Sequence, residues 1–150
     1  MKIGIISDTH GRLSDKCKDI FKQVDVIFHA GDIGSLSVIE ELEQIAPVYA
    51  VCGNMDFGEI AKKYPRTDLI EINNLYFFLM HEPFRLNIDP KAAGVNCVIF
   101  GHTHIPEVQE KDGIFYINPG SASLPKWGRN PTVALCDIKG RDIKVDIVEL

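Results

Sequence analysis

Seven side chains that can bind a metal ion stand at the ends of short apolar segments of this sequence. Two are carboxylates, one is an amide and four are imidazoles: Asp8, His10, Asp32, Asn54, His81, His102 and His104. If the apolar segments are neighbouring β-strands of an open α/β sheet, these side chains gather at the carboxyl ends of the strands, where such sheets place their sites. The spacing therefore predicts a metal centre.

The number of these side chains indicates two ions rather than one. Seven ligands are too many for one tetrahedral ion and suit two ions that share a bridging carboxylate. The donors include no thiolate, and this mixture fits manganese, iron, nickel or zinc better than magnesium or calcium. Two ions roughly 3.5–4 Å apart commonly stabilise the attacking and leaving oxygens of phosphoryl transfer. The expected chemistry is hydrolysis of a phosphate ester.

The order of these residues resembles the calcineurin-like metallophosphoesterase superfamily, in particular its small phosphodiesterase-type members. The matching motifs are Asp8-x-His10, Gly31-Asp32, Gly53-Asn54-x-Asp56, His81 and Gly101-His102-x-His104. The resemblance extends from Met1 to Ser121 and implies a phosphodiesterase that acts on a small substrate. It also implies two divalent ions, for which we predict manganese.

The resemblance assigns a role to each site residue. It implies that the first ion is bound by Asp8, His10 and His104, and the second by Asn54, His81 and His102, with Asp32 bridging them. A water or hydroxide between the ions would attack phosphorus in line. Asn54 and His102 would lie near the phosphoryl oxygens and His10 near the leaving group. Asp56 would orient the groups around Asn54 or the histidines.

Two positions depart from the family pattern. Met55 stands where many members carry a histidine that donates a proton to the leaving group, and a thioether cannot do this. Glu82 follows His81, where many members carry glycine. The Glu82 carboxylate is expected either to lie near the metals or to point into solvent.

Other residues that could take part are weighed against structural roles. His29 precedes the Gly31-Asp32 motif, and we expect it to lie either inside the sheet or behind Asp32, in a structural or supporting role. Arg12, Arg85 and Lys126 could contact a phosphate, but exposure to solvent is the favoured interpretation for each.

Two alternatives to a phosphodiesterase remain open. A related eukaryotic protein-sorting scaffold keeps this fold without a full ligand set, so the fold alone does not establish an enzyme. Here every ligand position of the family pattern is filled. Hydrolysis of a bond other than a phosphate ester would use the same ions, but the resemblance disfavours it.

Composition limits the partners and the location. The 150 residues are expected to form one domain, 1–150, with 16 Lys and Arg against 21 Asp and Glu and a net charge of −5. The basic residues are scattered, which disfavours binding of a large nucleic-acid duplex. No apolar run reaches the roughly 20 residues of a membrane span, so we expect a cytoplasmic protein, with a homodimer as one expected state. The four cysteines read as reduced core thiols.

The pattern of apolar residues changes along the chain. Strands are predicted at 2–7, 26–29 and 47–51, separated by helices that Ser14 and Ser35 would cap. Hairpins are predicted within 68–80, 108–117 and 132–148, with a short helix at 90–93 and a strand at 98–100. Together these elements predict an α/β fold, a four-layer α/β/β/α sandwich of two mixed sheets flanked by helices.

Overall fold

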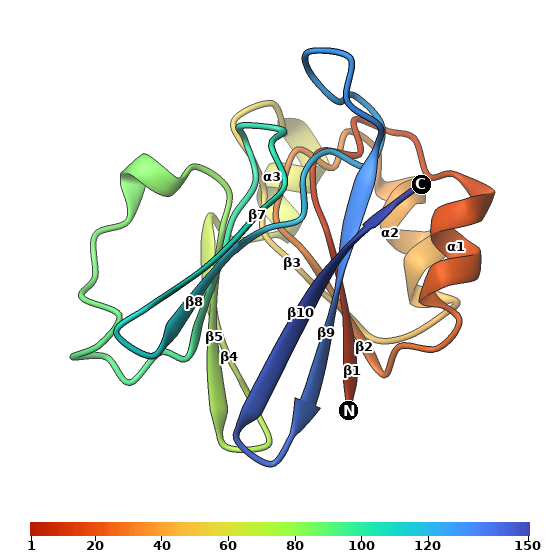
Figure 1. The fold of residues 1–150 in the computed structure, drawn as a ribbon. Coiled ribbons are helices and arrows are strands. Elements are labelled where there is room, and N and C mark those ends of the chain that lie inside the picture. The colour runs from red at the N-terminus through yellow and green to blue at the C-terminus, as the bar shows by residue number, and fades with distance from the viewer.

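Two five-stranded sheets lie face to face in the computed structural model, which describes residues 1–150 (Figure 1). The first sheet has the order β10-β9-β1-β2-β3 and the second β4-β5-β6-β8-β7. The strands of the first sheet are β1 (Lys2–Ile6), β2 (Val26–His29), β3 (Val48–Ala50), β9 (Thr132–Lys139) and β10 (Asp142–Glu149). Those of the second are β4 (Thr67–Ile72), β5 (Leu75–Met80), β6 (Cys97–Ile99), β7 (Glu107–Lys111) and β8 (Ile114–Asn118).

Both sheets are mixed, as predicted. Strands β1, β2 and β3 run parallel, and β9 and β10 join them as an antiparallel pair. In the second sheet β5, β6 and β8 run parallel, and β4 and β7 are antiparallel edge strands. Each sheet therefore has a parallel centre, and the carboxyl ends of its parallel strands meet at one edge.

The main core lies between the two sheets. Alternate residues of each strand point to opposite faces, and the inward ones are apolar. Phe28 of β2 and Phe77 of β5 meet edge to face across the interface, with ring centroids 5.3 Å apart. Strand β10 presents Ile143, Val145 and Ile147 to this core and stays half-buried, as its alternation predicts. This packing fixes the two sheets relative to each other.

Helices cover the outer face of the first sheet. Helices α1 (Asp15–Phe21) and α2 (Leu36–Glu43) begin after the predicted caps. The Ser14 hydroxyl accepts a hydrogen bond from the Cys17 amide at 3.1 Å, and the Ser35 hydroxyl one from Ser37 at 3.3 Å. A third helix, α3 (Gly58–Lys63), was not predicted.

The outer face of the second sheet is covered mainly by an irregular segment rather than a helix. Residues 82–96 cross this face, drawn in green in Figure 1, with one 3-10 turn at Pro83–Arg85. The predicted helix at 90–93 is wrong: these residues form a hydrogen-bonded turn that ends at Gly94. Pro90 begins this segment and Gly94, with φ of 72°, ends it. The residues between them are too few for a helix. Leu86 and Ile88 nevertheless pack on the sheet.

The predicted hairpins and cysteine states are confirmed. Asn73 and Asn74 both have positive φ, as do Asp112 and Gly113, which matches the two-residue turns typical of hairpins. The four cysteines are buried and free: Cys17, Cys52, Cys97 and Cys136. None of the helices is both long and apolar enough to cross a membrane.

Close contact between two loops shapes the edge of the first sheet. The His10 amide donates to the Asp32 carbonyl at 3.0 Å, and the Gly11 amide donates to the Ile33 carbonyl at 2.8 Å. Gly34 lies against this contact with φ of 85°, and a Cβ there would come within 2.3 Å of the Gly11 nitrogen. Only glycine fits at position 34.

We predict that Gly34→Ala destabilises the protein more than Gly140→Ala. Both glycines have positive φ, but a Cβ at Gly140 would meet nothing within 4 Å. The control should therefore cost about 1–2 kcal/mol from the left-handed backbone alone. Gly34→Ala should cost roughly 1–3 kcal/mol more from overpacking. Urea unfolding measures both, and equal losses would show that the two loops can separate freely.

Candidate metal centre

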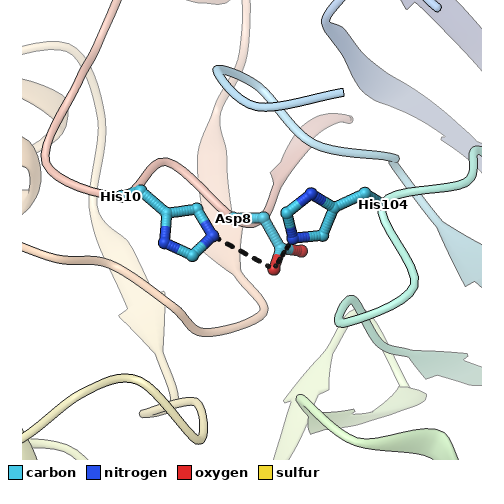
Figure 2. A group of neighbouring side chains, drawn as sticks. All are labelled: Asp8, His10 and His104. Atoms are coloured by element: carbon cyan, nitrogen blue, oxygen red, sulfur yellow. Dashed lines mark ion pairs between the residues drawn. The ribbon is translucent and has the colours of Figure 1, made fainter. Parts of the chain in front are cut away.

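The carboxylate of Asp8 lies at the centre of the site. Asp8 follows β1 and is fully buried. Its Oδ2 accepts hydrogen bonds from the Ser7 hydroxyl at 2.7 Å and the His102 amide at 3.1 Å. Its Oδ1 faces two imidazoles, with His104 Nε2 at 3.1 Å and His10 Nε2 at 3.8 Å (Figure 2). One oxygen is thus held by the protein, and the other faces the histidines.

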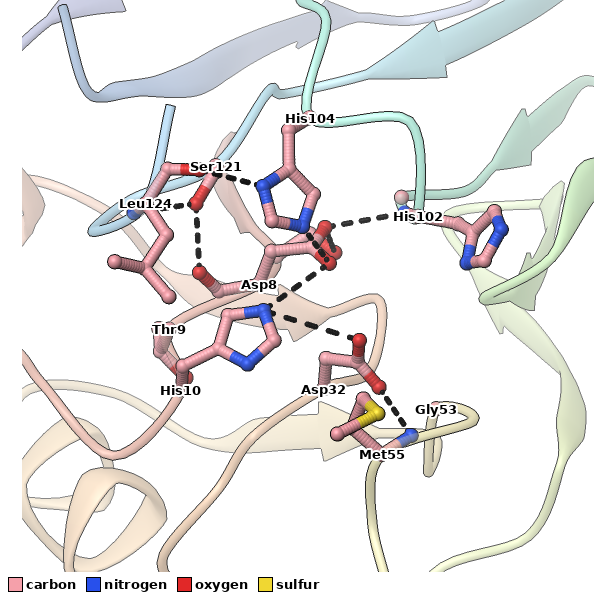
Figure 3. A network of polar contacts seen from close by, with 12 residues as sticks. Asp8, Thr9, His10, Asp32, Gly53, Met55, His102, His104, Ser121 and Leu124 are labelled. Carbon is pink, nitrogen blue, oxygen red and sulfur yellow. Dashed lines mark hydrogen bonds and ion pairs between the residues drawn. The ribbon is translucent and has the colours of Figure 1, made fainter. Parts of the chain in front are cut away.

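A second carboxylate, Asp32, follows β2 and lies close to the first. Its Oδ1 accepts a hydrogen bond from the Met55 amide at 2.8 Å (Figure 3). Its Oδ2 lies 3.2 Å from His81 Nε2 and 3.8 Å from His10 Nε2. Asp32 therefore stands between a histidine of the first sheet's loops and a histidine that follows β5 of the second sheet.

The ligand atoms form two compact groups. One comprises Asp8, His10 and His104, and the other Asp8, Asp32 and His81, with the atoms of each group within 4.8 Å of one another. Asp8 is thus common to both groups, and Asp32 is within reach of a histidine from each.

Unpaired buried atoms show that this arrangement fits a cation. Asp8 Oδ1, His10 Nε2 and His81 Nε2 are buried and form no hydrogen bond. His81 Nδ1 donates to the Ala30 carbonyl at 2.8 Å, and this turns the Nε2 lone pair toward Asp32. His104 Nδ1 bonds the Leu124 carbonyl in the same way. Such second bonds typically orient metal-ligating histidines, and a cation between the groups would satisfy all three atoms.

The charges of the site also suit a cation. Burial would raise the pKa of Asp8, but His10, His104 and His81 outweigh it and hold that pKa well below its usual range. Burial likewise opposes the lowering of the Asp32 pKa by His81. Burial would lower the pKa of His81, but Asp32 and Asp8 raise it. Both carboxylates are therefore ionised at neutral pH, and protons compete with metal for the histidines.

Asn54 and His102 lie together beside His81. Asn54 follows β3, and its Oδ1 is 3.1 Å from His102 Nδ1. The His102 ring meets the His81 ring edge to face at a centroid distance of 5.3 Å. Neither residue belongs to the two compact groups of carboxylates and histidines. The structure thus brings all seven predicted side chains to one edge, with these two on the His81 side.

Much of the backbone of the site is in the left-handed region, which residues other than glycine rarely adopt. Five of the seven predicted ligands have φ between 46° and 71°: Asp8, His10, Asp32, His102 and His104. Residues other than glycine in such conformations cost of order 1–3 kcal/mol each and cluster at active sites. Beyond the site, positive φ at such residues occurs in two hairpin turns and at Trp127. The strand ends are strained where they carry the ligands.

Asp56 acts on the backbone and not on a neighbouring side chain. Its Oδ2 accepts from the amides of Gly53 at 2.8 Å and Ile33 at 3.1 Å, and its Oδ1 from that of Gly34 at 3.0 Å. Asp56 therefore affects the groups around Asn54 only indirectly, through the backbone. Asp56 ties the loop after β3 to the loop after β2, and is a positioning residue.

His29 supports the site from inside the first sheet, as predicted. Its Nδ1 accepts a hydrogen bond from the Gly31 amide at 3.2 Å, so the proton lies on Nε2 and is donated to Thr9 Oγ1 at 2.9 Å. Thr9 in turn donates to the Ile33 carbonyl at 2.8 Å. Complete burial lowers the pKa of His29 to about 4. The neutral ring thus connects the two loops that carry Asp8 and Asp32.

Several supporting residues were missed from the sequence. The Ser121 hydroxyl donates to the Asp8 carbonyl at 2.8 Å, and the Ser123 hydroxyl donates to that of Thr9 at 2.6 Å. Arg66 Nη1 donates to the Gly53 carbonyl at 2.7 Å. The serines follow an Asn-Pro-Gly turn, and that motif could have indicated them. No sequence pattern indicated a role for Arg66.

The two departures from the family pattern take defined places. Met55 is 56% exposed at the edge of the site, and its amide donates to Asp32. Glu82 pairs with Arg85, with Oε2 3.2 Å from Nε, and belongs to neither ligand group. The Arg85 side chain is 70% exposed, as expected, and pairs with the extra carboxylate.

Known proteins share both the sequence and the fold. Residues 1–141 match the family described as the calcineurin-like phosphoesterase superfamily domain. A protein of Methanothermobacter thermautotrophicus named "Probable metallophosphoesterase" is 34% identical, over 99% of this chain and 92% of its own. A phosphodiesterase of Methanocaldococcus jannaschii is 33% identical, over 99% of this chain and all of its own. Vps29 of Entamoeba histolytica, solved with zinc, is 23% identical over 99% of both chains, with a TM-score of 0.79.

We predict that His29 makes the protein less stable in acid. Its folded pKa of about 4 lies below the ordinary value of 6.5, so the unfolded chain takes up the proton first and stability falls as pH drops from about 6.5 toward 4. Between pH 7 and 4.5 the loss from this residue should be roughly 2–3 kcal/mol.

His29→Gln should remove that part of the pH dependence, although it lowers stability at pH 7. Urea unfolding of metal-free parent and variant at both pH values measures the difference. A parent and a variant that lose the same stability on acidification would show that His29 is protonated in the folded state.

Proposed function

The chain belongs to the calcineurin-like phosphoesterase superfamily, and we propose that it is a metal-dependent phosphodiesterase with two divalent ions. The observation that carries this proposal is the set of buried, unpaired ligand atoms of Asp8, His10 and His81. The relative from Methanocaldococcus jannaschii, named a phosphodiesterase, supports the reaction. The donor set, which lacks thiolate, favours manganese, with nickel, iron and zinc as alternatives.

The residues divide between the two ions as follows. Asp8, His10 and His104 would hold the first ion, Asn54, His81 and His102 the second, and Asp32 would bind both. The ions would supply Lewis acidity, which lowers the pKa of an attacking water and neutralises charge on the phosphoryl group. The contact of Asp32 with His10 and His81 supports its bridging role.

The protein's own groups would orient the substrate. Asn54 and His102 lie together on the His81 side, where their polar atoms can contact phosphoryl oxygens. His10 lies on the opposite side of Asp32, where we place the leaving group. Ser121, Ser123, His29 and Asp56 would keep the ligand-bearing loops in position through backbone contacts.

A non-catalytic scaffold is the rival function. The similarity to Vps29, at 23% identity, bears on the fold alone. No observation in the site favours a scaffold, because an interaction surface does not require strained backbone around a buried carboxylate oxygen that forms no hydrogen bond. The two functions differ in turnover, which the next experiment measures.

The test is manganese-dependent hydrolysis of bis(p-nitrophenyl) phosphate, with Asp32→Asn as the diagnostic variant. The metal-stripped parent should be inactive and should recover when reloaded. Asp32→Asn should lose both ions and at least roughly a hundredfold in rate, because one neutral amide replaces the charge between two cations. Asp112→Asn makes the same change in an exposed hairpin turn and should have no effect.

Two results would contradict the proposal. A metal-loaded parent that leaves the aryl diester intact would favour the scaffold. An Asp32→Asn protein that keeps an ion and parent activity would remove the bridging assignment.

Met55 predicts which leaving groups the enzyme can expel. Without a proton donor at this position, an acidic phenolate should leave readily and an alkoxide slowly, since general acid catalysis is typically worth 10²–10⁴-fold. Met55→His should therefore raise the rate for an alkyl monoester relative to an aryl diester by roughly tenfold or more. Met55→Leu, which also lacks a proton, should not. If the parent cleaves both esters equally fast, another residue is the acid.

A further inference from the structure

A cavity of about 530 Å³ lies beside the His81 side of the centre and is lined by two arginines. Asn54 and His81, two of the predicted ligands, line it together with Arg66 and Arg85. Its volume lies within the range typical of small-molecule sites. A substrate bound at the ions would therefore have room to extend into this cavity.

Both arginines are held at one point and keep other donors free. Arg66 uses Nη1 to bind the Gly53 carbonyl, directly before Asn54. Arg85 uses Nε to bind Glu82, directly after His81. Each guanidinium has five N–H groups, so several remain available. Because each arginine is anchored next to a predicted ligand, its position is coupled to the centre.

The lining favours an anion. Among the lining residues, two guanidinium groups stand against one carboxylate, Glu82, and that carboxylate is already paired with Arg85. Thr67 and Asn87 add uncharged polar groups. The whole chain carries a net charge of −5, so this positive excess is local. Both arginines are exposed; an apolar substituent would offer their donors no acceptor, whereas phosphate oxygens would accept from them.

We propose that this cavity binds a second phosphate group carried by the substrate. The inference rests on the proposed function and narrows it to phosphodiesters that carry a terminal phosphate, as a 5′-phosphorylated dinucleotide does. The forked donors of arginine match phosphate oxygens better than a point charge would. The centre would bind the diester, and Arg66 and Arg85 would bind the terminal phosphate.

The test compares two thymidine dinucleotides, with and without a 5′-phosphate (pTpT and TpT), in the manganese-loaded enzyme. Chromatography measures kcat/KM for each, and their ratio is independent of the intrinsic rate of a variant. The parent should prefer pTpT by roughly tenfold or more, as expected for hydrogen bonds to a charged group. Arg66→Ala and Arg85→Ala should each reduce the ratio severalfold.

Arg141→Ala is the control. Arg141 lies in the exposed turn between β9 and β10, far along the chain from the cavity residues, and its loss should leave the ratio unchanged. Arg66→Ala also loses the bond to Gly53, so if that variant does not fold, Arg85→Ala decides. A parent ratio near one, or a ratio that survives Arg85→Ala, would overturn the inference.

Failure of this inference differs from failure of the proposed function. Hydrolysis of bis(p-nitrophenyl) phosphate with no preference for pTpT would reject the phosphate cavity and leave the phosphodiesterase intact. If the metal-loaded protein does not hydrolyse that ester at all, the proposed function fails. Calorimetric titration with pTpT and TpT then tests the cavity alone, with the same expected tenfold preference and its loss in Arg85→Ala.

Discussion

The buried carboxylate of Asp8 is the constraint on which the rest of the site depends. A charge without solvent is costly unless it is paired and hydrogen-bonded, and here only one of its oxygens accepts hydrogen bonds. The other faces the imidazoles of His10, His81 and His104, and in the last two the second nitrogen is tied to a backbone carbonyl. The protein alone leaves this oxygen incompletely satisfied. A cation would complete the arrangement and would make metal binding and the stability of these loops interdependent.

The two-sheet architecture brings the ligands together, but local bonds give them their precision. Ligands come from the ends of β1, β2 and β3 in one sheet and of β5 and β6 in the other, so packing between the sheets determines whether they meet. Strained backbone at five ligands would relax if the loops were free. Asp56, His29, Ser121 and Ser123 bind the backbone of those loops and hold it in place. These four residues therefore position the predicted ligands without being ligands themselves.

The residues around the centre bear on which substrates it can accept. The Met55 side chain reaches solvent and offers no proton, and Arg66 and Arg85 line the cavity beside His81. A positive region in a chain of net charge −5 can attract an anion locally without attracting nucleic acid over the whole surface. The ion pair of Arg85 with Glu82 also keeps the extra carboxylate in the cavity wall. The same contact therefore bears on both the metal centre and the cavity.

The sequence by itself determined the strands, the hairpins, two helix caps and the chemical types of the predicted ligands, because each depends on neighbouring residues. Alternation in β10, Asn73-Asn74 in a tight turn and Ser14 before α1 are local signals. Helix α3 was missed because it is short, has a single buried residue, Ile60, and lacks a side-chain cap. The predicted helix at 90–93 failed because Pro90 and Gly94 leave room for only one turn. The pairing of Glu82 with Arg85, the backbone role of Asp56 and the anchoring of Arg66 were decided only by the tertiary structure, since each depends on where separate loops come to lie after the two sheets pack.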